Sequence, residues 1–214
     1  KPKNISFEKS FKRIRQESVD SFKLLKRYRE FLKFCVCGLF YQAGIAVVIT
    51  LSAVYAQLVM KFTTAQTITL ILVVNITAAI GAFVFGYVQD RLGHKKTLAL
   101  TILLWIIMGV MAAFSHGPVS FWIAANIAGI AMGSSQSAGR AVVAVFAPAG
   151  ELAQFYSAWN VAVWGANVLG PITYGTVTWL TSGDQRTAIL VTTLFFVIGL
   201  LILRRVHLPS KTVC

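Results

Sequence analysis

Long apolar runs alternate with short polar segments along the chain after residue 30. Six runs are present, near residues 31–56, 66–89, 97–114, 119–146, 152–180 and 187–203. Each is close to or longer than the roughly 20 residues that an α-helix needs to cross a bilayer. The pattern therefore predicts an all-α, multi-pass membrane protein with six transmembrane helices in contact with the lipid bilayer.

The first 30 residues have a different composition, because ten of them are Lys or Arg. One stripe of mostly apolar residues recurs there every three or four positions: Phe7, Phe11, Ile14, Ser18, Phe22 and Leu25. A helix here would be basic and amphipathic and would be attracted to anionic lipid, but a basic linker before the first span fits equally well. We predict a basic cytoplasmic segment at residues 1–30, a six-helix bundle at 31–205 and a cytoplasmic tail at 206–214.

Lysine and arginine are distributed unevenly between the two sides of the predicted bundle. If the basic segment is cytoplasmic, 18 of the 20 Lys and Arg residues lie on that side. The other side holds Lys61 and Arg186. Because cytoplasmic loops of membrane proteins are enriched in these residues, we expect both termini to be cytoplasmic.

The composition argues against several classes of protein. With 57% hydrophobic and 13% charged residues, the chain has about half the charged fraction of a soluble domain. No nucleic-acid recognition motif accompanies the net charge of +13, so no nucleic-acid partner is expected. No predicted span contains a histidine, which leaves no Ser–His pair and no cluster of metal ligands. We therefore expect a protein that is not an enzyme and that uses neither a metal nor a cofactor.

Polar side chains interrupt the first, second, fourth and fifth spans, whereas the third and sixth are almost entirely apolar. Amides in hydrocarbon are costly unless they find partners, so these four spans are expected to surround a wet cleft while the other two face lipid. The same amides can instead hold neighbouring helices together. The predicted hydrogen-bonding groups for a small polar solute are Tyr41, Gln42, Asn126, Asn160 and Asn167.

The fourth predicted span contains a ridge of small residues with a spacing of four: Ala125, Gly129, Gly133, Ser137 and Ala141. Ala78, Ala82 and Gly86 form a similar ridge in the second span. Such ridges let another helix approach closely. In the fifth span, Gly170 and Pro171 predict a kink, and the same pair is the candidate hinge for a conformational change.

A charged loop joins the second and third predicted spans. Its residues resemble the signature loop of the major facilitator superfamily, which joins the second and third helices of each six-helix half: Gly86, Asp90, Arg91, Gly93 and Lys95. His94 stands where many members have Arg. The resemblance implies one half of a major facilitator fold, built as a 3+3 inverted repeat. It also implies a conformational latch, in which Asp90 faces the N-terminus of the fifth span near Glu151 and Arg91 helps to hold the loop.

The order of features across residues 31–205 is similar to the C-terminal half of the vacuole-effluxer-like branch of this superfamily, which is linked to autophagy. These features are Arg140, Glu151, Phe155, Tyr156 and the stretch 167–175. The resemblance implies a secondary active transporter that moves a small polar solute, amino acids among them, out across a membrane by alternating access. Residues 1–30 would then be the linker between two halves, and the N-terminal half would be the partner of this chain.

Two other functions fit the same sequence. A self-contained six-span protein would act as a homodimeric channel or transporter, and a membrane scaffold would bind partners through its basic N-terminal helix. No predicted span has a carboxylate at mid-membrane, so a proton or sodium relay would have to come from elsewhere in a larger protein. The chain also begins without Met, as expected of a fragment.

Overall fold

The structure is a computed structural model, and it describes residues 28–209. The predicted basic segment, up to residue 27, and the last five residues of the tail lie outside the described residues. Between residues 28 and 209 the regular elements are six α-helices, without strands. They are α2 (Arg29–Leu58), α3 (Thr64–Leu92), α4 (His94–Ala113), α5 (Pro118–Phe146), α6 (Leu152–Leu180) and α7 (Gln185–Arg204). The six-helix prediction is therefore confirmed.

Local signals in the sequence set the ends of several helices. At the start of α3, the Thr63 hydroxyl accepts a hydrogen bond from the backbone N–H of Gln66, and the Gln66 side chain accepts one from the backbone of Thr63. Gly93 separates α3 from α4 with a φ of 79°, a conformation that favours glycine. Pro118 lies in the first turn of α5, and Asp184 caps α7 by accepting from the backbone N–H of Arg186.

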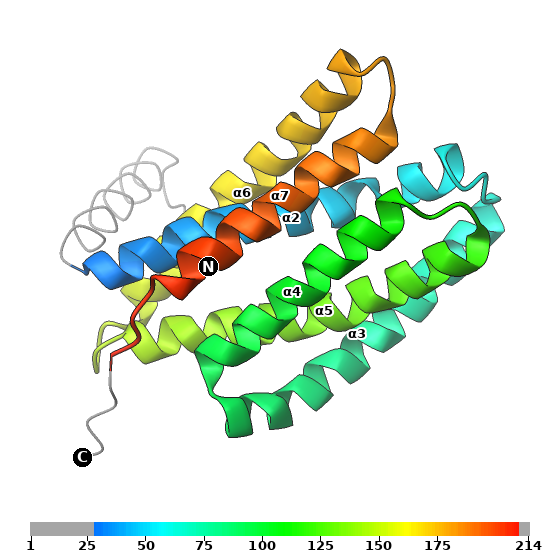
Figure 1. Ribbon diagram of the computed structural model, residues 1–214. Coiled ribbons are helices and arrows are strands. Elements are labelled where there is room, and N and C mark those ends of the chain that lie inside the picture. The colour runs from blue at the N-terminus through cyan, green and yellow to red at the C-terminus, as the bar shows by residue number, and fades with distance from the viewer. Residues whose placement is uncertain (1–27, 210–214) are drawn as a thin grey trace, which may run out of the picture.

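The helices form two groups of three that exchange their first members (Figure 1). In chain order the repeats are α2–α3–α4 and α5–α6–α7, yet α2 packs mainly against α6 and α7, and α5 packs mainly against α3 and α4. The last helices of the two repeats, α4 and α7, also pack against each other. This reciprocal pattern is the 3+3 inverted repeat that the signature loop implied.

Part of the small-residue ridge of α5, at Gly129 and Gly133, lies against α3, a close helix contact of the kind that the spacing predicted. A Cβ atom on Gly129 would lie 2.7 Å from the carbonyl oxygen of Val74, and one on Gly133 would overlap the carbonyl oxygen of Ala78. Conversely, a Cβ atom on Gly81 of α3 would lie 2.7 Å from the backbone of Ile130. The two backbones can approach this closely only because these positions lack side chains.

A matching close approach occurs in the other group of helices. A Cβ atom on Gly170 of α6 would overlap the carbonyl oxygen of Ala43 on α2. The crossing of α6 and α2 at Gly170 and Ala43 is thus the counterpart of the crossing of α3 and α5 at Gly81 and Ile130. At these two crossings, Gly81 of α3 corresponds to Gly170 of α6, and Ile130 of α5 corresponds to Ala43 of α2.

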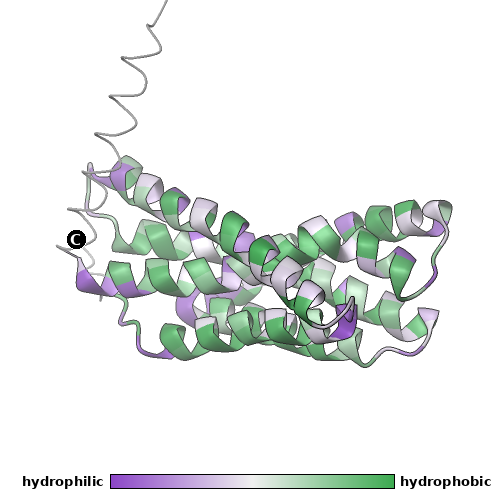
Figure 2. Ribbon diagram, turned by 90° about the horizontal axis from the view of Figure 1, so that it is seen from above, coloured by the Kyte–Doolittle hydropathy of each residue, from purple (hydrophilic) through white to green (hydrophobic). Residues whose placement is uncertain are grey.

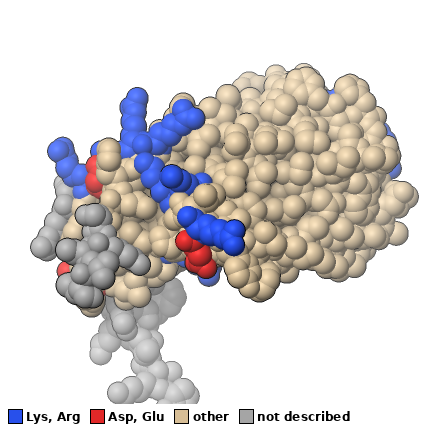
Figure 3. Space-filling model, turned by 60° about the horizontal axis from the view of Figure 1, so that its bottom comes forward, with Lys and Arg blue, Asp and Glu red and all other residues tan. Residues whose placement is uncertain are grey.

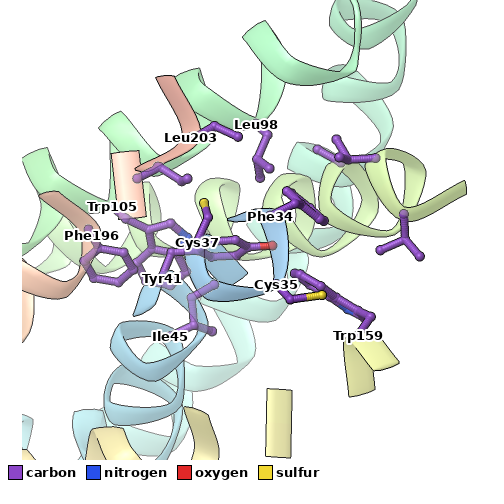
Figure 4. Close-up of a cluster of buried hydrophobic side chains, with 14 of the residues drawn as sticks. Phe34, Cys35, Cys37, Tyr41, Ile45, Leu98, Trp105, Trp159, Phe196 and Leu203 are labelled. Carbon is purple, nitrogen blue, oxygen red and sulfur yellow. The ribbon is translucent and has the colours of Figure 1, made fainter. Parts of the chain in front are cut away.

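Aromatic side chains fill the centre of the bundle (Figure 4). The rings of Phe34 and Trp159 stack with centroids 5.0 Å apart, and those of Trp105 and Phe196 stack with centroids 5.2 Å apart. Tyr41, which is fully buried, lies between the two pairs in Figure 4. This packing joins α2, α4, α6 and α7 into one core.

Hydrophobic residues dominate the helices, and hydrophilic residues gather towards the helix ends and loops (Figure 2). Within residues 28–209, four helices are long and apolar enough to cross a membrane: α2, α3, α4 and α7. Helices α5 and α6 are 29 residues long but carry more of the glycines, serines and amides. These apolar helices are those of an integral membrane protein.

The structure does not divide the helices into four that line a cleft and two that face lipid, as the sequence led us to expect. The most apolar stretch of α4 is 50% buried, whereas that of α3 is 11% buried. Helix α4 was expected to face lipid, but it packs against both α5 and α7. An apolar helix is compatible with either lipid or protein around it, so polarity alone does not fix its position.

Basic residues gather at one end of the molecule (Figure 3). We call this the basic end; its described Lys and Arg side chains are Arg29, Lys33, Arg91, Lys95, Lys96, Arg140, Arg204 and Arg205. The opposite end contains Lys61 and Arg186, which lie in or next to loops at the other ends of the helices.

Candidate functional site

Two exposed asparagines lie on one side of α6. Asn160 and Asn167 are separated by two helical turns, and the indole of Trp164, which is 66% exposed, lies between them. Neither asparagine side chain makes a hydrogen bond within the described residues. We call Asn160, Trp164 and Asn167 the α6 amide face. It offers unpaired hydrogen-bond donors and acceptors beside an aromatic ring.

The neighbouring side of α6 is apolar. Val161, Val168, Ile172 and Trp179 are all exposed there. Because amides are costly in hydrocarbon and these side chains are not, lipid can cover the apolar side but not the α6 amide face. The amides therefore need water, a solute or another protein segment as a partner.

Asn126, a third predicted solute ligand, has a different environment. It is partly buried on α5, and its amide nitrogen donates to the carbonyl oxygen of Trp122 at 2.8 Å. Asn75 on α3 satisfies its amide nitrogen in the same way, by donating to Ile71 at 2.8 Å. Such bonds within one helix occupy the donor but leave the side-chain oxygen free to accept.

Tyr41 and Gln42, the predicted ligands on α2, are both buried. Gln42 is hydrogen-bonded to Gln136 of α5. The Tyr41 hydroxyl is buried without a hydrogen-bond partner, close to Gly139 of α5. In this conformation the structure does not bring these two residues together with Asn160 and Asn167 at one exposed surface.

The bundle also contains a cavity of about 430 Å³ that none of the five predicted ligands lines. It lies between α2, α3, α4, α5 and α7, with Tyr174 of α6 also in its lining, in the half of the bundle away from the basic end. Its walls include Val47, Leu70, Met108, Ala124, Ala128 and Phe196. The sequence gives no direct signal for such a cavity, because its walls are mostly ordinary apolar residues, drawn from all six described helices.

The signature loop is anchored to α7 at the basic end. The Lys95 ammonium donates to the carbonyl oxygens of Arg204, at 3.1 Å, and Val206, at 2.6 Å. The next residue, His207, donates its backbone N–H to the Glu30 carboxylate at 2.7 Å. Lys95 thus satisfies carbonyls at the C-terminus of α7, where a positive charge is favourable.

The other latch residues are not joined to one another. Asp90 and Arg91 are exposed, and their side chains make no hydrogen bond or ion pair within residues 28–209. Glu151 precedes α6 and has one carboxylate oxygen buried without a partner. Helices α3 and α6 share no extensive interface in the described chain. A Cβ atom on Gly86 would meet nothing within 4 Å, so crowding in this structure does not explain that glycine.

The candidate hinge residues lie inside a continuous helix. Pro171 is within α6, which runs on to Leu180, and Gly170 is at the close crossing with α2. Packing alone therefore gives Gly170 a structural reason to lack a side chain. Among the described residues, no group of three or more His, Cys, Asp or Glu side chains is placed to hold a metal ion.

Comparison with solved structures defines the class of fold. The chain superposes on the E. coli fucose:proton symporter FucP with a TM-score of 0.75 and 18% identity, covering 98% of this chain and 48% of that one. It superposes on the inward-open xylose transporter XylE from E. coli with a TM-score of 0.69 and 19% identity, covering 83% of this chain and 47% of that one. The fold is one half of a major facilitator superfamily transporter.

Sequence relatives identify the family. The family model described as vacuole effluxer Atg22 like matches residues 7–213, and the chain belongs to this family. The chain is 28% identical to the uncharacterized MFS-type transporter YxiO of Bacillus subtilis, over 95% of this chain and 46% of that protein. It is 33% identical to a putative metabolite transport protein of Haemophilus influenzae, over 60% of this chain and 32% of that protein. The chain thus spans less than half the length of these two relatives.

Proposed function

We propose that the chain forms one half of a secondary transporter that moves a small polar solute by alternating access, with the solute bound between this half and another six-helix half. The relatives named as transporters support this assignment, and so does their length, which is about twice that of the chain. The observation that carries the proposal is the α6 amide face, where unpaired amides are exposed on a membrane-embedded helix.

The chemistry of this face favours recognition through hydrogen bonds. Asn160 and Asn167 each offer an NH₂ donor and an oxygen acceptor, and Trp164 adds a flat apolar surface. The carboxylates of the described chain lie at helix ends or in loops: Glu30, Asp90, Glu151 and Asp184. The α6 amide face therefore contributes neutral contacts, and a mid-membrane carboxylate that pairs with a solute ammonium group or couples transport to a cation would come from outside residues 28–209.

We further propose that the exposed Asp90 and Arg91 act on the other half rather than on α6 of this one. Both side chains are unpaired here, while Lys95 already holds the loop to the end of α7. A latch across the interface would form and break as the halves rock. The loop and both termini lie on the cytoplasmic side in this proposal, because the basic end carries most of the described positive charge.

Transport by the full-length protein in proteoliposomes tests the proposal. Uptake of labelled neutral sugars and neutral amino acids first identifies a solute, and Asn160→Leu and Asn167→Leu are then compared with the parent. Each substitution removes hydrogen bonds to the solute, so we expect about a tenfold loss of flux. Val168→Leu is the matched control, because it changes an exposed residue on the apolar side of the same helix.

The outcome is informative in both directions. Loss of flux in both asparagine variants, with normal membrane insertion and an unaffected Val168→Leu control, supports the site. Unchanged flux in both asparagine variants rejects the α6 amide face as the binding surface. If the parent protein binds a solute of the panel but moves none of the solutes down a concentration gradient, the result argues against transport itself.

A further inference from the structure

Helices α4 and α7 form the main joint between the two groups of three helices. One group is α2, α6 and α7, and the other is α3, α4 and α5. Between the groups, α4 and α7 share the most extensive interface, whereas α2 packs little against α3 or α5. The bonds between α4 and α7 therefore decide how firmly the two groups are held together. They lie within this half of the fold, so they do not depend on what covers its outer surface.

The two helices of this joint are antiparallel, and equivalent groups bond them at both ends. The second residue of α4, Lys95, donates to the carbonyl oxygen of Val206, the second residue after α7 ends, at 2.6 Å. The second residue of α7, Arg186, donates to the carbonyl oxygen of Ser115, the second residue after α4 ends, at 2.8 Å. The inverted repeat thus places the same kind of bond at opposite ends of one helix pair.

The middle of the α4–α7 interface is closely packed. Trp105 and Phe196 occupy the same position in two helices of 20 residues each, and their rings stack with centroids 5.2 Å apart. A Cβ atom on Gly109 of α4 would overlap the hydroxyl of Thr193 on α7. Because the centre is held by packing, a separation of α4 from α7 has to begin at an end.

The positions of Lys95 and Arg186 are explained by the neighbouring helix and not by their own. A positive charge at the start of a helix is unfavourable for that helix. In an antiparallel pair, each start lies beside the C-terminus of the other helix, where a cation is favourable and carbonyl oxygens lack partners. Ser115 and Val206 are 2% and 0% exposed, so their carbonyl oxygens need partners within the protein.

We propose that Lys95 and Arg186 are positioning residues that fasten the two groups of helices to each other, one at each end of the α4–α7 interface. Loss of one cation lets the groups separate at that end alone, because the stacked centre and the other cation remain. During transport, the two bonds keep this half from opening between its own groups at either membrane surface. This last role rests on the proposed function, whereas the fastening itself does not.

Distances between the two groups test the proposal, measured by pulsed electron paramagnetic resonance on the full-length protein in nanodiscs. Spin labels are attached to two introduced cysteines, one in each group, in a background without other accessible cysteines. The label pairs are Val119→Cys with Leu180→Cys, away from the basic end, and Tyr87→Cys with Leu152→Cys, at the basic end. Both labels of a pair lie in this half, so rocking of one half against the other does not change their distance.

Each variant should act at one end only. Arg186→Met should raise the fraction of molecules with longer distances about fivefold for the pair away from the basic end, and leave the other pair unchanged. Lys95→Met should have the opposite pattern. Arg186→Lys and Lys95→Arg keep a cationic donor and should match the parent at both ends.

Lys61→Met and Lys96→Met are the matched controls, because each removes an exposed cation from the same end and should leave both distances unchanged. An unchanged distance at the matching end in either Arg186→Met or Lys95→Met overturns the proposal. Equal changes at both ends overturn it as well, because they would show a general loss of stability. If one of the two variants does not insert, the other decides by the same criteria.

Discussion

The side-chain amides of Gln42 and Gln136 hydrogen-bond to each other across α2 and α5. The Gln136 nitrogen lies 3.3 Å from the Gln42 oxygen, and the Gln42 nitrogen lies 3.5 Å from the Gln136 oxygen. These are the first helices of the two repeats, and they otherwise pack little against each other. The amide pair is therefore a polar link between the repeats at a point where apolar packing is sparse.

We expect this pair to contribute modestly to stability. In a double-mutant cycle with Gln42→Leu and Gln136→Leu, the coupling free energy should be about 0.6–2 kcal/mol, the range for hydrogen bonds between membrane helices. Unfolding of the four proteins in detergent and denaturant measures it. Coupling close to zero would mean that the amides interact with other groups, such as a bound solute.

Gly170 should tolerate no side chain. A Cβ atom there would overlap the carbonyl oxygen of Ala43, so Gly170→Ala must separate α6 from α2. We expect a loss of about 1–3 kcal/mol, as for other overpacked sites. Gly175→Ala is the control on the same helix, because its Cβ would meet nothing within 4 Å. Equal thermal stability of the two variants would contradict the close crossing.

Lys95 should stabilise the end of α7. Its bonds to Arg204 and Val206 are lost in Lys95→Met, and we expect local stability to fall by about 1 kcal/mol. Hydrogen exchange of the backbone amides of residues 205–207 should then accelerate about fivefold. Lys96→Met removes an exposed neighbouring charge and should have little effect. Unchanged exchange in Lys95→Met would assign the loop a role in topology alone.

Asp184 should make the folding stability of the protein depend on pH. Hydrogen bonds from the Thr187 hydroxyl and backbone, together with Arg186, lower the pKa of this carboxyl below 3.8. Its contribution is therefore fully present above the unfolded pKa and is lost as the pH falls through the lower folded pKa. Asp184→Asn keeps an oxygen that can cap α7 but cannot titrate.

The thermal midpoint of the parent, measured against that of Asp184→Asn, tests this dependence. The difference between the two midpoints should be constant near neutral pH and should shrink below pH about 4. Groups that titrate in both proteins cancel in the comparison. A difference that does not change with pH would mean that Asp184 makes no charge-dependent contribution to folding.

The fold was largely predictable because long apolar runs have few alternatives in a membrane. Helix ends were predicted to within a few residues, and the spacing of Gly129 and Gly133 correctly indicated a close helix contact. The partner of each helix was harder to predict. That α2 packs against α6 and α7 depends on the exchange between repeats, which no local pattern encodes.

The candidate site was less predictable, because the direction of a side chain depends on the rotation of its helix. Tyr41 and Asn160 both interrupt apolar runs, yet Tyr41 is buried in the aromatic core while Asn160 is exposed. Nothing around either residue in the sequence distinguishes them. The cavity was harder still, since small residues that line it, such as Ala128, are equally common in tightly packed helices.

The exchange of helices between the repeats also constrains the order in which the protein is made. Of the six described helices, α2 leaves the ribosome first, but its main partners begin only at Leu152 and Gln185. At about 5–20 residues per second, that leaves α2 without its native neighbours for on the order of ten seconds. During this interval the amide of Gln42 and the hydroxyl of Tyr41 must be kept from hydrocarbon. Until the fifth and sixth of these helices have emerged, α2 therefore has to be held by other groups, such as the membrane insertion machinery or the other half of the transporter.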